Sequence, residues 1–225
     1  MPVGIYENPV WQNVPDQTMH PGGLTITEQA LSFCNVPPGA LVLDVGCGAG
    51  ATISYITSKL GFNGLGLDVS AELLSRAYNN NSNSGFAQAR SEQLPIANAS
   101  VNLILSECTL SIFETDDALY EFERILKNDG YLIISDLYAR NENGIAALRE
   151  LPSESCISSS MTRSQIENKL KQNKFRIEVW QDCSDKLNEF SVCTLTTASA
   201  IDPFDLHIAA AKAKLGYYFL IAKKV

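Results

Sequence analysis

The sequence predicts an α/β fold built on a mostly parallel sheet, and three observations lead to it. Short apolar runs alternate with helix-length segments along most of the 225 residues. Two of these runs end in an acid, at Asp44 and at Asp68, with room for one helix between them. The first run continues directly into the glycine-rich turn of residues 46–50. Alternating strands and helices form right-handed crossovers, so we expect both acids at one edge of a parallel sheet.

Local signals set the boundaries of the predicted elements. Ser70 is a typical N-cap residue, and Gly61 is suited to close a helix. Residues 79–84 are polar and predict a loop, whereas residues 176–180 alternate in polarity like a strand. We expect helices over residues 27–34, 51–60, 70–79, 118–128, 162–172, 185–200 and 205–215, and strands over residues 41–45, 64–68, 85–89, 101–106, 130–136, 176–180 and 216–224.

The glycine turn and the two acids indicate a nucleotide-like ligand. Gly46 and Gly48 allow a tight turn and a close approach of the main chain, and Gly50 allows the next helix to pack closely. Because the turn opens a helix, we expect free N–H groups to face the site. A dinucleotide is one candidate. Asp44 argues against a pyrophosphate and favours an ammonium or sulfonium group, and S-adenosylmethionine carries both, with a ribose for Asp68.

Several ordered motifs resemble those of class I S-adenosylmethionine-dependent methyltransferases. Residues 42–50 resemble the first motif and residues 66–70 the acidic motif of the second strand. Residues 91–96 resemble the loop before the fourth strand in the type 11 group, which includes ubiquinone and menaquinone biosynthesis enzymes. The resemblance implies a Rossmann-like methyltransferase fold with a mostly parallel seven-stranded sheet, an antiparallel last strand and helices on both faces. It also implies transfer of a methyl group to a small-molecule acceptor by in-line displacement.

The same resemblance assigns the cofactor contacts of S-adenosylmethionine. Asp44 should face the ammonium group, and Asp68 should accept both ribose hydroxyls, which requires a carboxylate. Val69 should pack on the adenine. The methionine end should lie on the backbone of the glycine turn, at Gly46, Cys47 and Gly48.

The register places Arg90, Ser91 and Glu92 where many relatives have an acid that receives the adenine amino group. Arginine cannot accept a hydrogen bond. Either Ser91 contacts the adenine edge, or Arg90 stacks on the ring, or Arg90 is a surface residue paired with Glu92. Ser106, at the end of the fourth strand, completes the candidate contacts on this side.

Two residues are candidates for catalysis. Glu107 follows the fourth strand and is suited to act as a general base or to hold a cationic substrate. His20 is a second candidate base, because its reference pKa lies near physiological pH. Gly22 and Gly23 are expected to approach the cofactor carboxylate through bare N–H groups. For the neighbouring Cys108 we favour a role as a small buried hydrophobic residue.

The chain is expected to form one domain over residues 1–225. Residues 1–24 should form a lid, residues 25–140 the cofactor-binding core, and residues 141–225 the last strands with insertions that shape the substrate pocket. Three functions stay open: a small-molecule methyltransferase, a non-catalytic S-adenosylmethionine-binding accessory protein, and a nicotinamide-dependent oxidoreductase. The sequence leaves the acceptor and the oligomeric state open.

Charge and composition limit the partners. The net charge is −8 and the basic residues are scattered, so we expect no nucleic-acid partner. No signal pattern or long apolar run is present, which predicts a cytoplasmic protein without membrane insertion. Six cysteines without a C-x-x-C pair favour reduced thiols and no metal site.

Overall fold

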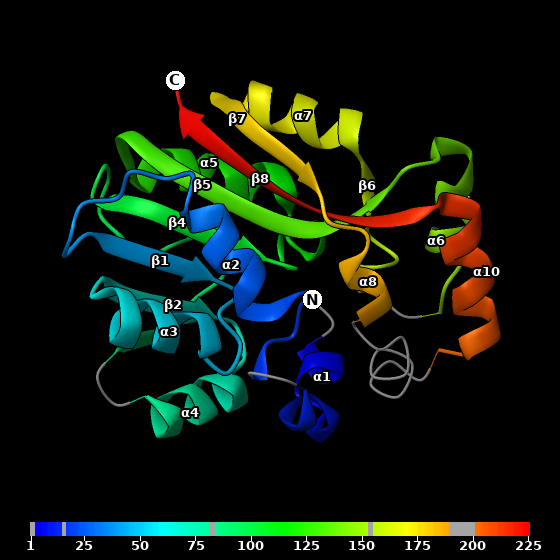
Figure 1. Ribbon diagram of the computed structural model, residues 1–225, viewed down its shortest axis with the longest axis horizontal. Coiled ribbons are helices and arrows are strands. Elements are labelled where there is room, and N and C mark those ends of the chain that lie inside the picture. Colours follow the sequence, from blue (N-terminus) through cyan, green and yellow to red (C-terminus); the bar gives the residue numbers. More distant parts are fainter. Residues whose placement is uncertain (1–2, 15–16, 82–83, 153–154, 190–200) are drawn as a thin grey trace.

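The computed structural model describes residues 3–14, 17–81, 84–152, 155–189 and 201–225 (Figure 1). An eight-stranded sheet runs through the molecule in the order β3-β2-β1-β4-β5-β8-β7, and the short β6 pairs with β5. Every strand pairing is parallel except those of β8, which lies antiparallel between β5 and β7. The strands are β1 (Leu41–Val45), β2 (Asn63–Asp68), β3 (Gly85–Gln88), β4 (Val101–Glu107), β5 (Leu126–Ala139), β6 (Met161–Thr162), β7 (Phe175–Asp182) and β8 (Leu215–Lys224).

The predicted fold class is therefore confirmed, including the antiparallel last strand. The sheet has one strand more than expected, because Met161 and Thr162 pair with Tyr138 and Ala139 beyond the end of the predicted fifth strand. This extra strand leads directly into the N-cap of the next helix, where Thr162 forms a capping box with Gln165.

Helices cover both faces of the sheet (Figure 1). Successive strand residues point to opposite faces, so Val42 belongs to one core cluster and Leu43 to the other. The first cluster receives side chains from α2 (Gly23–Leu31), α3 (Ala51–Leu60), α4 (Ala71–Asn80), α6 (Ile145–Arg149) and α10 (Pro203–Ala213), and the second from α5 (Thr115–Ile125) and α7 (Arg163–Gln172).

Helix boundaries follow the predicted caps where local chemistry decides them. Ser70 caps α4 by accepting a hydrogen bond from the Leu73 N–H at 3.1 Å, and α3 ends at Gly61 as expected. The helix expected over residues 118–128 ends instead at Ile125, because Leu126 is extended and pairs with Val101. Of the helix expected over residues 185–200, α8 (Lys186–Glu189) is present, and residues 190–200 lie outside the described residues.

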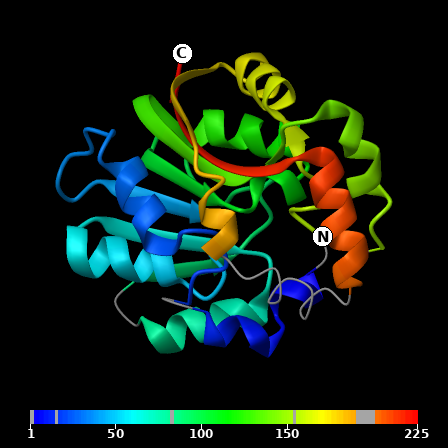
Figure 2. The same ribbon diagram turned by 45° about the vertical axis from the view of Figure 1, so that its right-hand side comes forward.

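The N-terminal segment crosses the carboxyl edge of the sheet, passes beside α4 and leads into α2 (Figure 2). It contains α1 (Val3–Tyr6) and the 3₁₀ turn η1 (Pro9–Asn13). Glu7 accepts a hydrogen bond from Ser70 Oγ at 2.6 Å, and its carbonyl accepts one from Arg76 at 3.0 Å. These contacts attach the segment to the first turns of α4. No helix in the described part of the chain is long and apolar enough to cross a membrane.

Candidate functional site

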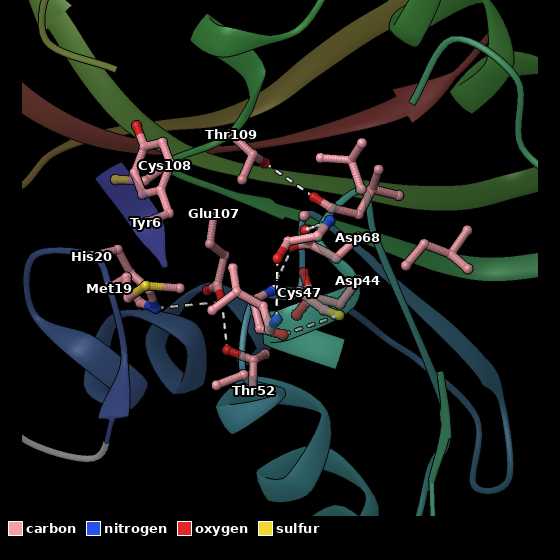
Figure 3. Close-up of a pocket in the computed structure, with 18 of the residues that line it drawn as sticks. Tyr6, Met19, His20, Asp44, Cys47, Thr52, Asp68, Glu107, Cys108 and Thr109 are labelled. Atoms are coloured by element: carbon pink, nitrogen blue, oxygen red, sulfur yellow. Dashed lines mark hydrogen bonds and ion pairs between the residues drawn. The ribbon is translucent and has the colours of Figure 1, made fainter. Parts of the chain in front are cut away.

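A pocket opens at the carboxyl ends of β1, β2 and β4, under the N-terminal segment (Figure 3). Most of the sequence-predicted site residues line it: His20, Asp44, Gly46, Cys47, Gly48, Asp68, Val69, Ser91 and Glu107. The others do not line it: Gly22, Gly23, Arg90, Glu92 and Ser106.

Asp44 stands at the base of the pocket with its charge uncompensated. It is 3% exposed, and within the described ranges no side chain or N–H group donates a hydrogen bond to its carboxylate. Burial raises its pKa well above the usual range, and the charges of Glu107 and Asp68 raise it further. A buried carboxylate is costly without a partner. The site therefore favours a ligand that brings a cation to Asp44.

The glycine turn differs from expectation in its hydrogen bonding. The N–H groups of Gly46 and Cys47 both donate to the Leu67 carbonyl, at 2.7 and 3.1 Å, and that of Gly48 donates to Asp68 Oδ2 at 2.8 Å. The prediction of free N–H groups facing the site is wrong at these three positions. Because a pyrophosphate is held by such donors, the turn is poorly suited to a dinucleotide.

Gly46 is required for a steric reason that involves the protein and no ligand. Its φ is +84°, and a Cβ there would lie 2.4 Å from Thr109 Cγ2. Thr109 Oγ1 donates to the Val45 carbonyl at 3.0 Å and lies 2.8 Å from Ser106 Oγ. Ser106 is fully buried and acts on the pocket only through this threonine. Gly50 behaves as predicted, because a Cβ would meet the Phe86 ring at 2.9 Å.

We expect Gly46→Ala to destabilise the protein by about 2–4 kcal/mol, the sum of left-handed strain and overpacking against Thr109. The matched control is Gly61→Ala, where φ is +69° and no atom lies within 4 Å of the added Cβ. The control should lose only about 1–2 kcal/mol of strain. Equilibrium unfolding in urea measures both variants, and equal losses would contradict the close contact with Thr109.

Asp68 is oriented by the backbone around it. Its Oδ1 accepts the Ser70 N–H at 2.9 Å and its Oδ2 accepts the Gly48 N–H at 2.8 Å. Burial raises the pKa of Asp68, and these backbone donors offset part of the rise. Each carboxylate oxygen has a second lone pair. The two oxygens are thus held in place with capacity to accept two further hydrogen bonds from a ligand.

The neighbouring side chains of Arg90 and Ser91 differ in burial: Ser91 is buried at the pocket and Arg90 is exposed. Ser91 is 2% exposed, and within the described residues its Oγ has no hydrogen-bond partner, although it lines the pocket. The Arg90 side chain is 60% exposed and lies 3.2 Å from Glu92 Oε2. Of the three alternatives for this segment, the structure has the surface pair of Arg90 and Glu92. Ser91 remains the candidate to contact a base, next to Val69.

Glu107 is held from several directions by side chains distant in the sequence (Figure 3). Its Oε1 accepts a hydrogen bond from Thr27 at 2.6 Å, and its Oε2 accepts one from Thr52 at 2.7 Å. His20 Nε2 lies 3.4 Å from Oε2, an ion-pair distance without hydrogen-bond alignment. His20 Nδ1 lies 3.5 Å from the Tyr217 hydroxyl.

The charges of this network stabilise each other. Burial alone would raise the pKa of Glu107, but His20, Thr27 and Thr52 outweigh it and lower that pKa. Burial alone would lower the pKa of His20, but Glu107 outweighs it and raises that pKa. Each of the two groups thus favours the charged form of the other. Neither group is arranged as a free general base.

Gly22 and Gly23 shape the turn that carries His20 to Glu107. Gly22 has φ +76° at the N-cap of α2, and a Cβ there would lie 2.4 Å from Ile26. The Gly23 N–H donates to the His20 carbonyl at 3.3 Å. Neither glycine lines the pocket, so the structure does not support the predicted contact with a cofactor carboxylate.

Five residues of the site were not named individually as candidates, although two of them lie in the segment of residues 1–24 that was expected to form the lid. Thr27, Thr52 and Thr109 hold Glu107 and the glycine turn, and Tyr6 and Met19 line the pocket from the N-terminal segment. One signal was available: Thr52 lies in the first turn of the helix that the glycine turn opens. Tyr6 and Met19 lie within the expected lid, whereas no local pattern indicates that Thr27 approaches Glu107.

Comparison with known proteins identifies the family. A methyltransferase domain family matches residues 38–200, which is more than half of the chain. The chain belongs to this methyltransferase family. Among its relatives are an uncharacterised methyltransferase, YodH, of Bacillus subtilis and an arsenite methyltransferase of Halobacterium salinarum. YodH is 35% identical over 51% of this chain and 50% of its own length. The arsenite methyltransferase is 30% identical over 47% of this chain and 29% of its own length.

The alignments to these curated relatives span half of their length or less. Solved structures extend the likeness in fold to the whole chain. The [4+2]-cyclase SpnF superposes with a TM-score of 0.78 at 20% identity, covering 99% of this chain and 94% of the cyclase. A geranyl diphosphate C-methyltransferase of Streptomyces coelicolor, solved with S-adenosyl-L-homocysteine, superposes with a TM-score of 0.72 at 12% identity. The superposition covers 90% of this chain and 79% of that methyltransferase.

Proposed function

We propose that this methyltransferase-family protein binds S-adenosylmethionine and transfers its methyl group to a small-molecule acceptor. One observation carries the proposal: a buried carboxylate, Asp44, stands unpaired beside a glycine turn whose N–H groups are occupied. This arrangement suits a ligand with an ammonium group and does not suit a pyrophosphate. The nicotinamide-dependent alternative is thereby disfavoured.

The residues present fit the cofactor at each of its parts. Asp44 would pair with the ammonium group, and Asp68 would accept the ribose hydroxyls through its two remaining lone pairs. Val69 would pack on the adenine, and the unpartnered hydroxyl of Ser91 would contact the adenine edge. When bound, S-adenosylmethionine supplies a methyl group on a positively charged sulfur. The chain's own residues position the reactants and exclude water.

Glu107 and His20 are proposed as positioning residues. Their ion pair joins the segment of residues 17–23 to the end of β4 and, through Thr27 and Thr52, to α2 and α3. Residues 1–24 would thus act as a lid over the cofactor, held at His20 and at Glu7.

The proposal includes a small acceptor, no nucleic-acid partner and a location in the cytoplasm. The arsenite methyltransferase among the relatives, and a phosphoethanolamine N-methyltransferase of Arabidopsis thaliana, are named for small acceptors, which supports a small acceptor here. A polynucleotide is disfavoured because the pocket lining contains three carboxylates. The five described cysteines are all free thiols, which supports a reducing compartment such as the cytoplasm.

Calorimetric titration with S-adenosylmethionine, S-adenosylhomocysteine and NAD tests the proposal. We expect the first two to bind and NAD not to bind. The ribose assignment is tested by changing the ligand and the protein in turn. The affinities of S-adenosylhomocysteine and of its 2′-deoxy analogue are measured for the parent protein and for Asp68→Ala. Loss of the hydroxyl should weaken binding to the parent by roughly tenfold, the value of one hydrogen bond to a charged group.

On Asp68→Ala the two ligands should bind equally. Damage to the glycine turn would weaken both ligands alike and leave their ratio unchanged, so the ratio reports the ribose contact specifically. An undiminished preference for the 2′-hydroxyl on the variant would disprove the assignment. Binding of NAD in place of the adenosyl ligands would overturn the proposed function itself.

A further inference from the structure

The basic residues of the chain all lie away from the pocket. The sequence contains 17 lysines and arginines, and the stretches left out of the structure contain none of them. Not one of the 17 lines the pocket. Among the described residues, the charged groups in the lining are three carboxylates and the histidine that is already paired with Glu107.

No arginine or lysine of the described lining is available to hold an anionic acceptor. A phosphate or carboxylate group is bound by arginine, lysine or a set of free backbone N–H groups. The pocket lacks the first two, and the N–H groups of Gly46, Cys47 and Gly48 are used within the protein. With Glu107 paired to His20, no cationic side chain in the described lining is left to attract an anion.

One end of the pocket is apolar and reaches the glycine turn at Gly48 through the methyl group of Met19. Figure 3 shows Tyr6, Met19 and Cys108 on the side of Glu107 opposite Asp68, and we call these three residues the acceptor end. A thioether, an aromatic ring and a thiol form soft, weakly polar surfaces. A partly apolar molecule is the natural occupant of such a surface.

None of the described side chains at or beside the acceptor end is free to remove a proton. Both ring nitrogens of His20 face Glu107 and Tyr217, and both oxygens of Glu107 accept threonine hydroxyls. Burial raises the pKa of Tyr6 well above its ordinary value, and contact with Cys156 together with burial raises that of Cys108. Neither side chain is therefore anionic at neutral pH.

We infer that the acceptor is an uncharged, partly apolar molecule whose nucleophile becomes cationic on methylation, a weakly basic heteroaromatic nitrogen or a thioether sulfur, and that it carries no phosphate or carboxylate. The inference rests on the methyl transfer proposed above. The acceptor lone pair forms the new bond to carbon while the old carbon–sulfur bond breaks and leaves its electron pair on the departing sulfur. No proton moves, and the described lining has no unpaired cationic side chain to repel the cationic product.

The test uses the full chain saturated with S-adenosylhomocysteine. Binding of isoquinoline, isoquinoline-5-carboxylate and thioanisole is measured by calorimetry. Turnover of isoquinoline, thioanisole and 2-naphthol with S-adenosylmethionine is followed by mass spectrometry. We expect isoquinoline or thioanisole to bind at least about tenfold more tightly than the carboxylate. The methylated cation should form from the same compound, and 2-naphthol should stay unmethylated. The isoquinoline and thioanisole arms distinguish nitrogen from sulfur.

Met19→Arg should shift the preference toward isoquinoline-5-carboxylate by about tenfold, whereas the uncharged control Met19→Gln should leave the ratio as in the parent. Equal or tighter binding of the carboxylate by the parent, binding of none of the three compounds, or faster methylation of 2-naphthol would each overturn the inference. Failure to bind S-adenosylhomocysteine in the first step would overturn the proposed function instead, so the two failures are distinguishable.

Discussion

Asp44→Asn is expected to weaken S-adenosylmethionine binding by at least about 30-fold, because losing one partner of a buried charge pair costs roughly 2 kcal/mol or more. At a pH above the raised pKa of Asp44, the same change should stabilise the ligand-free protein by about 1–3 kcal/mol, since it removes a buried charge that has no donor. Calorimetry measures the first effect and urea unfolding the second. Opposite signs for affinity and stability distinguish a binding residue from a structural one.

The pH dependence of Asp44 has a definite sign. Its folded-state pKa is raised by burial, so the folded protein holds a proton that the unfolded chain has released. The stability of the ligand-free protein should therefore increase as the pH falls through that raised pKa, and affinity for a cationic ligand should decrease. Asp68 contributes in the same direction, so the difference between parent and Asp44→Asn isolates Asp44.

Asp117→Asn is the matched control for Asp44→Asn, because it removes an equal charge from an exposed position in the first turn of α5. It should leave both affinity and the pH profile as in the parent. A parent-like affinity in Asp44→Asn would show that the ammonium group lies elsewhere.

Glu107→Gln is expected to destabilise the protein by about 3–5 kcal/mol near pH 6, the usual cost of removing one member of a buried ion pair. The pKa of His20 should fall in the variant, because its partner is lost while its burial remains. Urea unfolding at a series of pH values and NMR titration of His20 measure these effects. A cycle with His20→Gln gives the coupling between the two residues.

The loss should be largest between about pH 4.5 and 6.5, the unperturbed pKa values of the two groups. The pKa of Glu107 is lowered, so its contribution is present above pH 4.5 and disappears as the pH falls through the folded-state value. The pKa of His20 is raised, so its contribution is present below pH 6.5 and disappears as the pH rises through the folded-state value. A variant of parental stability with lost turnover would identify Glu107 as the base instead.

Much of the cofactor side of the pocket was predictable. Asp44 and Asp68 end neighbouring parallel strands, so their meeting follows from topology, and Ser70 and Gly61 mark helix ends through hydrogen bonds made within a few residues. Alternating apolar runs indicate which strand residues face each core. All of these features depend on interactions over short sequence distances or on the regular geometry of a parallel sheet.

Other features depend on residues that are far apart in the chain. Glu107 meets Thr27 and His20 only because α2 and the N-terminal turn pack across the end of β4. The outward direction of Arg90 and the use of the glycine-turn N–H groups by Leu67 and Asp68 arise in the same way. Local patterns specify periodicity and turns, whereas the partner of a buried polar group is chosen by packing. Packing alone thus left Asp44 unpaired and placed His20 beside Glu107.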